Sequence, residues 1–424
     1  MALSRIWAAF LILSIVVAAA RYTFVPAEKD IFGQMVTGKA TDPGARADGL
    51  IQTCGNAVSL VLGLIGILAF FMGLVNIAEK AGGIRLLARW TAPFFSRLFP
   101  DVPRGHPAMG HMVMNFSANM LGLDNAATPF ALKAMESLQE LNPDKSSASN
   151  SQIMFLCLHA SGLQVVPVSI LALRASLHAP DPTDIFIPIV IATFITTVAS
   201  MCIVAAWQRI NIFQPVVLAW VGGMAMIIAA LVIYLRSLTP DHVQSFSRAL
   251  SGGLILLIVL LIIIGALYKR IDLFGAFVEG AKGGFDTAVR IIPYLVGMLT
   301  AISLLRTSGT FDTVMEGIRH FFSWIGTDTR FVDGLPTALI KPFTAAGARG
   351  MMVDAMQGHP NSFGARLSGI MQGSSETTFY VVAVYYGAVA IKNTRYSIPA
   401  MLLAELVSVL ASIFLCYLFF GSVR

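Results

Sequence analysis

Residues 58–77 read VSLVLGLIGILAFFMGLVNI, a run of 20 residues without a charged side chain. A helix needs about 20 apolar residues to cross the hydrocarbon core of a bilayer, so this stretch predicts a membrane span. Further strongly apolar runs lie at 6–20, 184–207, 215–235, 252–268, 288–305 and 397–420. With 56% hydrophobic and only 12% charged residues, the chain is predicted to be an all-α polytopic membrane protein.

Charge, cysteine and histidine content exclude several other classes. The formal net charge is +6, and no basic run with interleaved aromatic residues indicates nucleic-acid binding. The four cysteines are scattered, and the seven histidines show no spacing typical of metal ligands. The sequence therefore predicts no metal site, no cofactor and no nucleic-acid partner, and the partner that it does predict is the lipid bilayer.

The sequence repeats itself in two halves. Residues 30–38 read DIFGQMVTG and residues 272–280 read DLFGAFVEG, and an apolar run precedes and follows each. Three further matches come in the same order, namely NAATPFALKAM (125–135) with AGARGMMVDAM (346–356), SGLQ (161–164) with SSET (374–377), and 184–200 with 395–412. The apolar run 215–235 lies between the halves and has no counterpart. Internal repeats are a recurring plan of secondary transporters.

The number of spans predicts how the halves are oriented. The unpaired run follows four spans of the first half, at 6–25, 57–78, 152–173 and 184–207. Because five is odd, we predict inverted-topology repeats and about nine spans in all. This count requires that 107–138 dips into the membrane and returns, and Gly122 and the clustered Asn residues predict a buried, non-helical turn at 121–126.

The first apolar run and the basic residues after the second bear on topology. The run at 6–20 resembles a signal peptide, but its counterpart at 252–268 predicts that it is a retained helix. The segment 80–104 contains five Lys and Arg residues and one acid. Since positive segments tend to stay in the cytoplasm, this segment favours an N-terminus inside.

Four polar segments interrupt the apolar chain, at 115–129 (NFSANMLGLDNAATP), 159–164, 341–350 and 372–378. In hydrocarbon an unpaired backbone group costs several kcal/mol, so non-helical backbone survives only inside protein or along a wet cavity. We therefore expect broken or re-entrant helices here, of the kind that form the binding sites of transporters. A purely structural role, in which these side chains only cap helix ends, is the alternative.

Charged residues in these segments are candidates for function, because ionisable groups within a membrane usually have one. Asp124, Lys341, Arg349 and Glu376 are the four. The repeat aligns Thr128 with Arg349, and Asp124 precedes Thr128 by one turn, so an Asp124–Arg349 pair across the halves is a hypothesis. The candidate binding residues are Asn115, Asn119, Asp124, Asn125, Thr128, Ser161 and Gln164 in the first half, and Arg349, Gln372, Ser374, Glu376 and Thr377 in the second.

The polar segments also carry a family resemblance. NFSANMLGLDNAATPFALKAMESLQELN (115–142) resembles the spore maturation protein A family. KPFTAAGARGMMVDAM (341–356) and MQGSSETTFYVVAVYYGAVAIKNTRYSIPA (371–400), with IIPYLVGMLTAISLLRTSG (291–309), resemble spore maturation protein B. Both halves resemble the nucleoside recognition, or Gate, domain family. The resemblance implies an A-like Gate domain at 1–212, a linker with one span at 213–250 and a B-like Gate domain at 251–424.

What the resemblance implies is a multi-pass protein of the bacterial inner membrane with a transporter-like core. We expect a transporter or channel-like protein for a small polar solute, with the site between the two Gate repeats near the membrane midplane. The solute is nucleoside-like by the family label alone. A non-transporting envelope or spore-maturation scaffold is the alternative. An enzyme is not expected, since no pair of catalytic base and nucleophile stands out. The sequence leaves open the substrate, any coupling ion and assembly as a homo-oligomer.

Overall fold

The computed structural model describes residues 2–25, 29–38, 49–103, 105–120, 124–164, 167–238 and 240–421. Within these ranges the chain is helical, and its single strand-like contact is a bridge between Ser147 and Asn393. This confirms the predicted all-α class. The helices up to the linker are α1 (Ala2–Phe24), α2 (Ile31–Thr37), α3 (Leu50–Lys80), α4 (Gly83–Leu98), α5 (Pro107–Met120), α6 (Asp124–Leu141), α7 (Asn150–Ala160), α8 (Val168–Ser176), α9 (Phe186–Gln208) and α10 (Pro215–Arg236).

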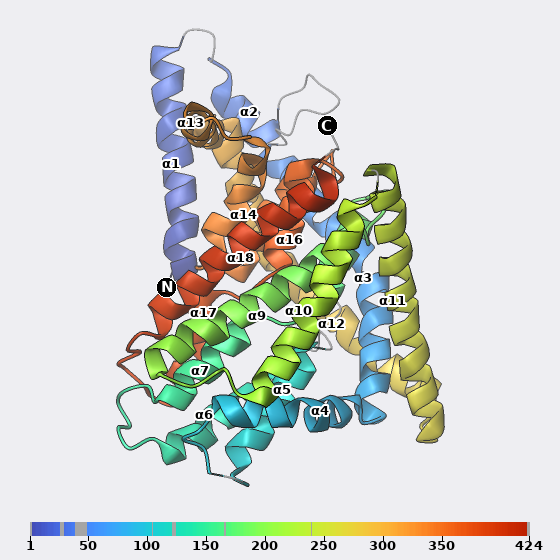
Figure 1. The fold of residues 1–424 in the computed structure, drawn as a ribbon. Coiled ribbons are helices and arrows are strands. Elements are labelled where there is room, and N and C mark those ends of the chain that lie inside the picture. The colour runs from blue at the N-terminus through green and yellow to red at the C-terminus, as the bar shows by residue number, and fades with distance from the viewer. Residues whose placement is uncertain are drawn as a thin grey trace.

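The second half likewise combines long helices with short ones (Figure 1). They are α11 (Pro240–Tyr268), α12 (Leu273–Thr307), α13 (Thr310–Trp324), the 3₁₀ helix η2 (Arg330–Gly334), α14 (Leu335–Ile340), α15 (Ala345–Met356), α16 (Phe363–Gly373), α17 (Thr378–Ala388) and α18 (Ser397–Phe420). The sequence matches place α2 and α3 against α12, α6 against α15, and α9 against α18.

Side-chain caps start several of the helices that lie near the polar centre. Ser149 and Gln152 form a reciprocal capping box at the start of α7. Thr344 and Ser362 accept hydrogen bonds from backbone N–H groups at the starts of α15 and α16. Such caps satisfy N–H groups that have no partner inside the helix, so these short helices can begin within a densely packed region.

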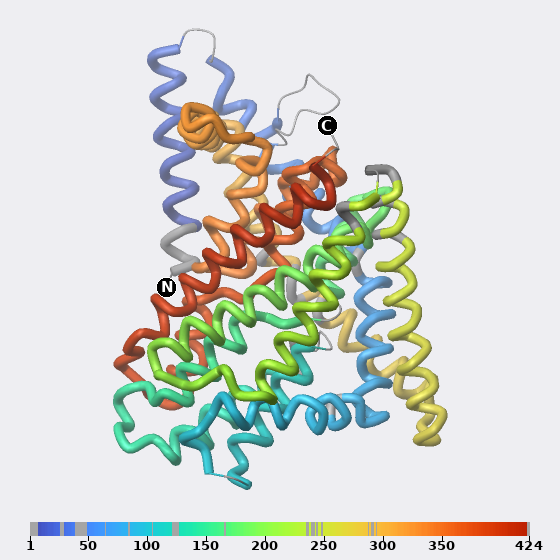
Figure 2. The backbone as a smooth tube through the Cα atoms, in the orientation of Figure 1, coloured from blue at the N-terminus to red at the C-terminus, as the bar shows by residue number. Residues whose placement is uncertain are grey.

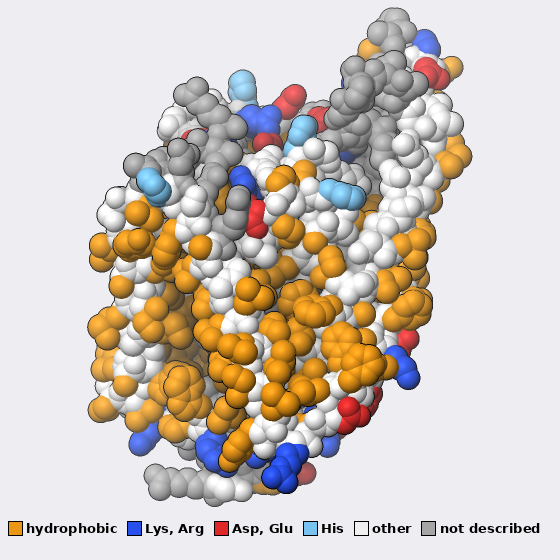
Figure 3. Space-filling view, turned by 90° about the vertical axis from the view of Figure 1, so that its right-hand side faces the viewer, with side chains coloured by type: hydrophobic (Ala, Val, Ile, Leu, Met, Phe, Trp, Pro, Cys, Tyr) orange, Lys and Arg blue, Asp and Glu red, His pale blue; other side chains and the backbone are white. Residues whose placement is uncertain are grey.

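Six helices are long and apolar enough to cross a membrane within the described residues. They contain Trp7–Phe24, Leu50–Lys80, Phe186–Gln208, Pro215–Tyr234, Ala249–Tyr268 and Ser397–Phe420. Figure 3 shows a band of hydrophobic side chains across the middle of one face, while charged side chains gather toward its two ends. The protein is therefore a multi-pass membrane protein, whereas the count of nine spans stays a prediction.

One of the predicted spans differs from the structure. The run at 152–173 is divided between α7 and α8, so it is a broken helix rather than one continuous span. The break follows from the polar segment SGLQ, where the apolar run is interrupted. The run at 288–305 lies within the continuous helix α12.

Helices α3 and α12 pack closely and run in opposite directions. The Asn76 side chain donates to the carbonyl of Ala276, 2.7 Å away. A Cβ atom on Gly280 would lie 2.4 Å from the carbonyl oxygen of Met72, and one on Gly284 would lie 2.7 Å from the backbone of Ala69. Contacts with lower residue numbers on α3 thus fall at higher residue numbers on α12, so the two helices are antiparallel. In Figure 1, α3 descends to α4 at the bottom, and α12 ascends toward α13 at the top.

Helices α9 and α18 form a second antiparallel pair, side by side in Figure 2. At one end the rings of Trp207 and Tyr396 stack with centroids 5.2 Å apart. At the other end Arg366 donates to Asp184, just before α9, and its guanidinium lies 4.5 Å from the ring of Phe420 near the end of α18. The end of α9 thus lies by the start of α18, and the start of α9 by the end of α18.

The polar segment at 115–129 breaks the chain into two helices that pack against each other. Helix α5 ends at Met120 and α6 begins at Asp124, and the two helices pack against each other, with the Asn115 side chain donating to the carbonyl of Ala127 at 2.8 Å. The prediction of a non-helical turn at 121–126 is wrong for 124–126, which are the first residues of α6. Residues 121–123 lie outside the described residues. Asp and Asn are favoured at helix N-termini, which explains why these polar residues start a helix instead of forming a loop.

Candidate functional site

The two aligned segments SGLQ and SSET meet at the centre of the molecule. Each follows a short helix, α7 or α16, at the point where it ends. The backbone N–H of Glu376 donates to the carbonyl of Ala160 at 2.7 Å. Gly162 has a φ of +60°, and a Cβ atom on it would lie 3.4 Å from the backbone of Ser375. Glycine suits this position because it adopts a positive φ without strain and lets the second half approach.

The same pair of hydrogen bonds supports the break in each half. Ser161 donates to the carbonyl of Leu158 and pairs with the hydroxyl of Thr197 on α9 at 2.8 Å. In the second half, Ser374 donates to the carbonyl of Met371 at 2.9 Å and accepts from Ser408 on α18 at 2.7 Å. Both serines are buried. Their hydroxyl groups therefore hydrogen-bond each helix end to the neighbouring long helix. This is the purely structural role that the sequence left as the alternative.

A cavity of about 70 Å³ lies between the two breaks. Its first-half lining includes Gly162, Gln164 and Ser169, and its second-half lining includes Lys341, Arg349, Gln372, Ser375, Glu376 and Thr377. Five of the twelve predicted binding residues are therefore brought together here, namely Gln164, Arg349, Gln372, Glu376 and Thr377. Three of the lining side chains, Lys341, Arg349 and Glu376, carry charge.

Lys341 is the main residue that the predicted set omitted. Its side chain is 3% exposed, and its ammonium group donates to the carbonyls of Met371 and Gln372 at the end of α16, the latter at 3.1 Å. It is also attracted electrostatically to Glu405 and Glu376. A lysine is favourable at a helix C-terminus, where the carbonyls carry partial negative charge. The sequence does indicate this residue, because the polar segment 341–350 begins with Lys341 inside an apolar region.

The asparagines of the first half belong to a separate network. Asn115 donates to the carbonyl of Ala127 at 2.8 Å and so joins α5 to α6. The Nδ1 atom of His159 lies 3.1 Å from both the Asn115 and the Asn119 side chains. All of these side chains are buried, and neither asparagine lines the central cavity. Both asparagines were predicted to line a binding site, and in the structure their side chains have hydrogen-bond partners within the protein.

The remaining candidates divide as follows. Thr128 lies half-buried on α6. The side chains of Asp124 and Asn125 lie outside the described residues, and with them the hypothesis of an Asp124–Arg349 pair. Within the described residues, no group of three or more His, Cys, Asp and Glu side chains is arranged to hold a metal ion.

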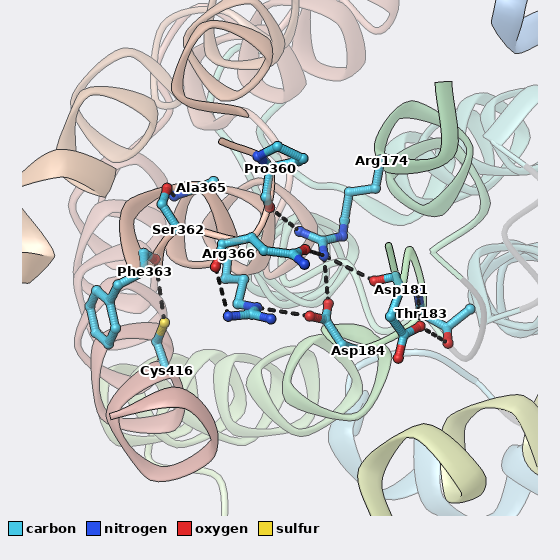
Figure 4. Close-up of polar contacts among 11 residues, drawn as sticks. Arg174, Asp181, Thr183, Asp184, Pro360, Ser362, Phe363, Ala365, Arg366 and Cys416 are labelled. Carbon is cyan, nitrogen blue, oxygen red and sulfur yellow. Dashed lines mark hydrogen bonds and ion pairs between the residues drawn. The ribbon is translucent and has the colours of Figure 1, made fainter. Parts of the chain in front are cut away.

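A buried cluster of charged side chains, outside the lining of the central cavity, also joins the two halves (Figure 4). The carboxylate of Asp184 accepts from Arg174 at 2.7 Å and from Arg366 at 2.8 Å. Arg174 is fully buried and also donates to the carbonyl of Pro360 and the side chain of Asn361. None of these residues stands out in the sequence, because Arg174 and Asp184 lie near the ends of apolar runs and their contacts in the second half are about 180 positions away.

A wider, open cavity of about 610 Å³ lies between the loop at 142–151 and residues 393–395. Its lining side chains are largely used in turns of the loop itself. For example, hydrogen bonds from the hydroxyls of Ser146 and Ser147 lower the pKa of the Asp144 carboxyl to about 2. Arg395 donates to the Ala148 carbonyl and to Asn150, so this region is a second contact between the halves.

Broken helices that meet at a polar cavity, enclosed by long apolar helices, define a multi-pass α-helical membrane protein with a buried polar centre. A family model described as nucleoside recognition (Gate) matches residues 61–177 and 288–392, together just over half of the chain. The chain belongs to the nucleoside recognition (Gate) family. The matched ranges include both breaks and most of the cavity lining.

Two curated relatives come from Bacillus subtilis (strain 168). The chain is 42% identical to spore maturation protein A over 147 residues, which are 35% of this chain and 75% of that protein. It is 43% identical to spore maturation protein B over 174 residues, which are 41% of this chain and 96% of that protein. No solved structure gives a significant match. These relatives confirm the resemblance drawn from the polar segments.

Proposed function

We propose that this protein is a transporter or channel-like protein of the bacterial inner membrane, and that a small polar solute binds in the cavity of about 70 Å³. The observation that carries the proposal is the lining of this cavity. It combines two cations, Lys341 and Arg349, with the carboxylate of Glu376 and the amides of Gln164 and Gln372, at the junction of two broken helices. Such groups fix the orientation of a polar ligand.

The arrangement of the helices supports inverted-topology repeats around this cavity. The matched pairs α3/α12 and α9/α18 are each antiparallel. The amphipathic helices α4 and α13, which follow α3 and α12, lie at opposite ends of the molecule in Figure 1. A repeat related by an axis in the membrane plane produces this reversal, whereas an axis along the membrane normal would leave the matched helices parallel.

The volume of the cavity bears on the class of solute. Ligand pockets for drug-sized molecules usually measure about 300–1,000 Å³, several times the volume found here. A solute of a few non-hydrogen atoms fits the cavity as it stands, whereas a nucleoside would require the two halves to move apart. We therefore propose a small polar solute with an anionic group, which Arg349 is suited to hold because its planar guanidinium binds carboxylates and phosphates through two parallel hydrogen bonds.

A non-transporting role in the cell envelope is the second candidate. The closed network of Asn115, Asn119 and His159 favours it, because these buried side chains hold α5, α6 and α7 together. The names of the Bacillus relatives point to spore maturation, and this chain would then act as a scaffold or regulator with a sealed polar core. We assign no catalytic reaction to either candidate.

A ligand-stabilisation screen of the purified full chain separates the two. Nucleosides, nucleobases, small organic acids and inorganic ions are each added in detergent, and the thermal unfolding midpoint is measured. A ligand at 100 times its Kd stabilises the fold by about 2.7 kcal/mol. We expect a small anion to raise the midpoint.

The matched variants are Arg349→Lys in the cavity and Arg319→Lys in an exposed ion pair with Asp333. Arg349→Lys should fold and lose most of the ligand effect, while Arg319→Lys should keep it. If no solute in the screen stabilises the protein, or if the stabilising solute acts equally on Arg349→Lys, this cavity is not the binding site.

A further inference from the structure

A second, smaller cavity lies where α9 and α18 cross. Its volume is about 10 Å³, close to what one water molecule or one monatomic ion requires. The cavity adjoins the larger one, because Ser375 and Glu376 line both. Its other polar lining side chains are Ser161, Thr196, Ser200, Thr378 and Glu405.

Three buried oxygen atoms on the wall of this cavity have no hydrogen-bond partner among the described residues. They are the hydroxyl oxygens of Ser200 and Ser375 and the Oε1 atom of Glu405. Ser200 is 1% exposed and Glu405 is 6% exposed. Buried polar atoms are nearly always paired, and leaving one unpaired costs about 1–3 kcal/mol, more for a charged group. Three such atoms around one small cavity therefore indicate a ligand.

The chemistry of the lining indicates a cation. The lining supplies hydroxyl oxygens and the carboxylates of Glu376 and Glu405, and Glu405 already uses its other oxygen to accept from Thr378 at 2.9 Å. Mg²⁺ usually keeps several waters, for which a cavity of about 10 Å³ has no room. Ca²⁺ takes six to eight oxygen ligands, often from several carboxylates, and the described residues hold no group of three or more acidic, His or Cys side chains arranged to hold a metal ion. The lining therefore fits a small monovalent ion better.

We propose that this cavity is a Na⁺ site, in which Glu405, Ser200 and Ser375 coordinate the ion. The site takes one ligand from α9, one from the break before α17 and one from α18, so it joins both halves at their crossing. Its existence does not depend on transport. A role as the coupling ion does rest on the proposed function.

The charges around the two cavities agree with this assignment. Lys341 is attracted electrostatically to both Glu376 and Glu405. The formal charges of Lys341 and Arg349 match those of the two carboxylates, so a bound Na⁺ gives the group a formal charge of +1. An anionic solute in the neighbouring cavity complements this charge. Na⁺ and that solute should then each raise the affinity for the other, as linkage requires.

The site is tested on the purified full chain in detergent without any solute. The thermal unfolding midpoint is measured in NaCl, KCl and choline chloride at equal ionic strength. We expect a saturable rise with Na⁺ that K⁺ and choline do not reproduce. Equal effects of the three salts would overturn the assignment.

Three variants locate the effect. Glu405→Gln keeps an acceptor for Thr378 but removes the charge, and should abolish the Na⁺-dependent rise. Ser200→Ala should raise the Na⁺ concentration at half-saturation several-fold. If Glu405→Gln does not fold, the result for Ser200→Ala tests the site by itself. Ser251→Ala removes another fully buried hydroxyl that has no partner among the described residues, away from this cavity, and should leave the response unchanged. A normal Na⁺ response in Ser200→Ala, or in a folded Glu405→Gln, would overturn the site. A solute screen run in choline chloride tests the larger cavity separately.

Discussion

Buried charged side chains do two different things in this protein. Lys341, Arg349 and Glu376 line the cavity of about 70 Å³ in which we propose that a solute binds. At Asp184, Arg174 and Arg366 each donate to one carboxylate oxygen. Arg174 also donates to the carbonyl of Pro360 in the second half. A buried ion pair adds little net stability compared with apolar packing, but removing one partner leaves the other charge uncompensated. The cluster at Asp184 therefore links the two halves through buried charges.

Asp184→Asn should destabilise the fold by about 3–5 kcal/mol, because it leaves Arg174 and Arg366 buried without their counter-charge. The matched control is Asp333→Asn, which removes the acid of an exposed pair with Arg319 and should cost at most about 1 kcal/mol. Unfolding in detergent compares the two. Equal stabilities of both variants would show that the buried cluster does not hold the halves together.

At the scale of elements, the close approach of α3 and α12 depends on glycines at particular positions. Gly284 faces the backbone of Ala69, with no room for a Cβ atom, whereas the adjacent Gly283 has open space at the same position. Short side chains let helix axes approach, and packing in a membrane relies on such contacts because lipid offers the same apolar environment as a neighbouring helix.

Gly284→Ala should therefore destabilise the protein by about 1–3 kcal/mol through overpacking. Gly283→Ala, one residue away on the same helix, should be neutral or slightly stabilising, because alanine is a better helix former. Thermal unfolding of both variants in detergent gives the comparison. A larger loss in Gly283→Ala than in Gly284→Ala would contradict the observed packing.

The elements also show what could be predicted from the sequence. Apolar runs predicted the long helices, and the repeated motifs predicted which helices correspond, because both depend on local composition. The broken helix at α7 and α8 was predicted as one span, although SGLQ was recognised as polar, because length and hydropathy alone do not register a break. Residues 124–126 were assigned to a turn because Asp and Asn are common both in turns and at helix starts.

The site was harder to predict because its residues are distant in sequence. Arg349, Gln372 and Glu376 were predicted from their polar context, and the structure brings them to one cavity with Gln164. The same reasoning also chose Asn115 and Asn119, whose partners lie within the protein. Ser200 and Glu405 line the smaller cavity together because α9 packs against α18, which no local pattern specifies.

For the whole molecule, we propose that the two halves are inverted in the membrane. The matched helices α3/α12 and α9/α18 run antiparallel, and α4 and α13 lie at opposite ends (Figure 1). Residues of both halves line the cavity. In the proposed arrangement the same kind of break approaches the cavity from both halves, and alternating access would follow if one half rocks against the other.

Cysteine accessibility tests the inversion most directly. Single cysteines replace Thr37 on α2 and Lys282 on α12, two exposed positions close to the ends of the matched motifs, in a variant without the four native cysteines. A membrane-impermeant maleimide is applied to right-side-out and inside-out vesicles, and permeabilised vesicles show that both positions react. We predict that Thr37→Cys and Lys282→Cys are labelled from opposite sides of the membrane. Labelling of both from the same side would contradict the inverted arrangement and the shared central site built on it.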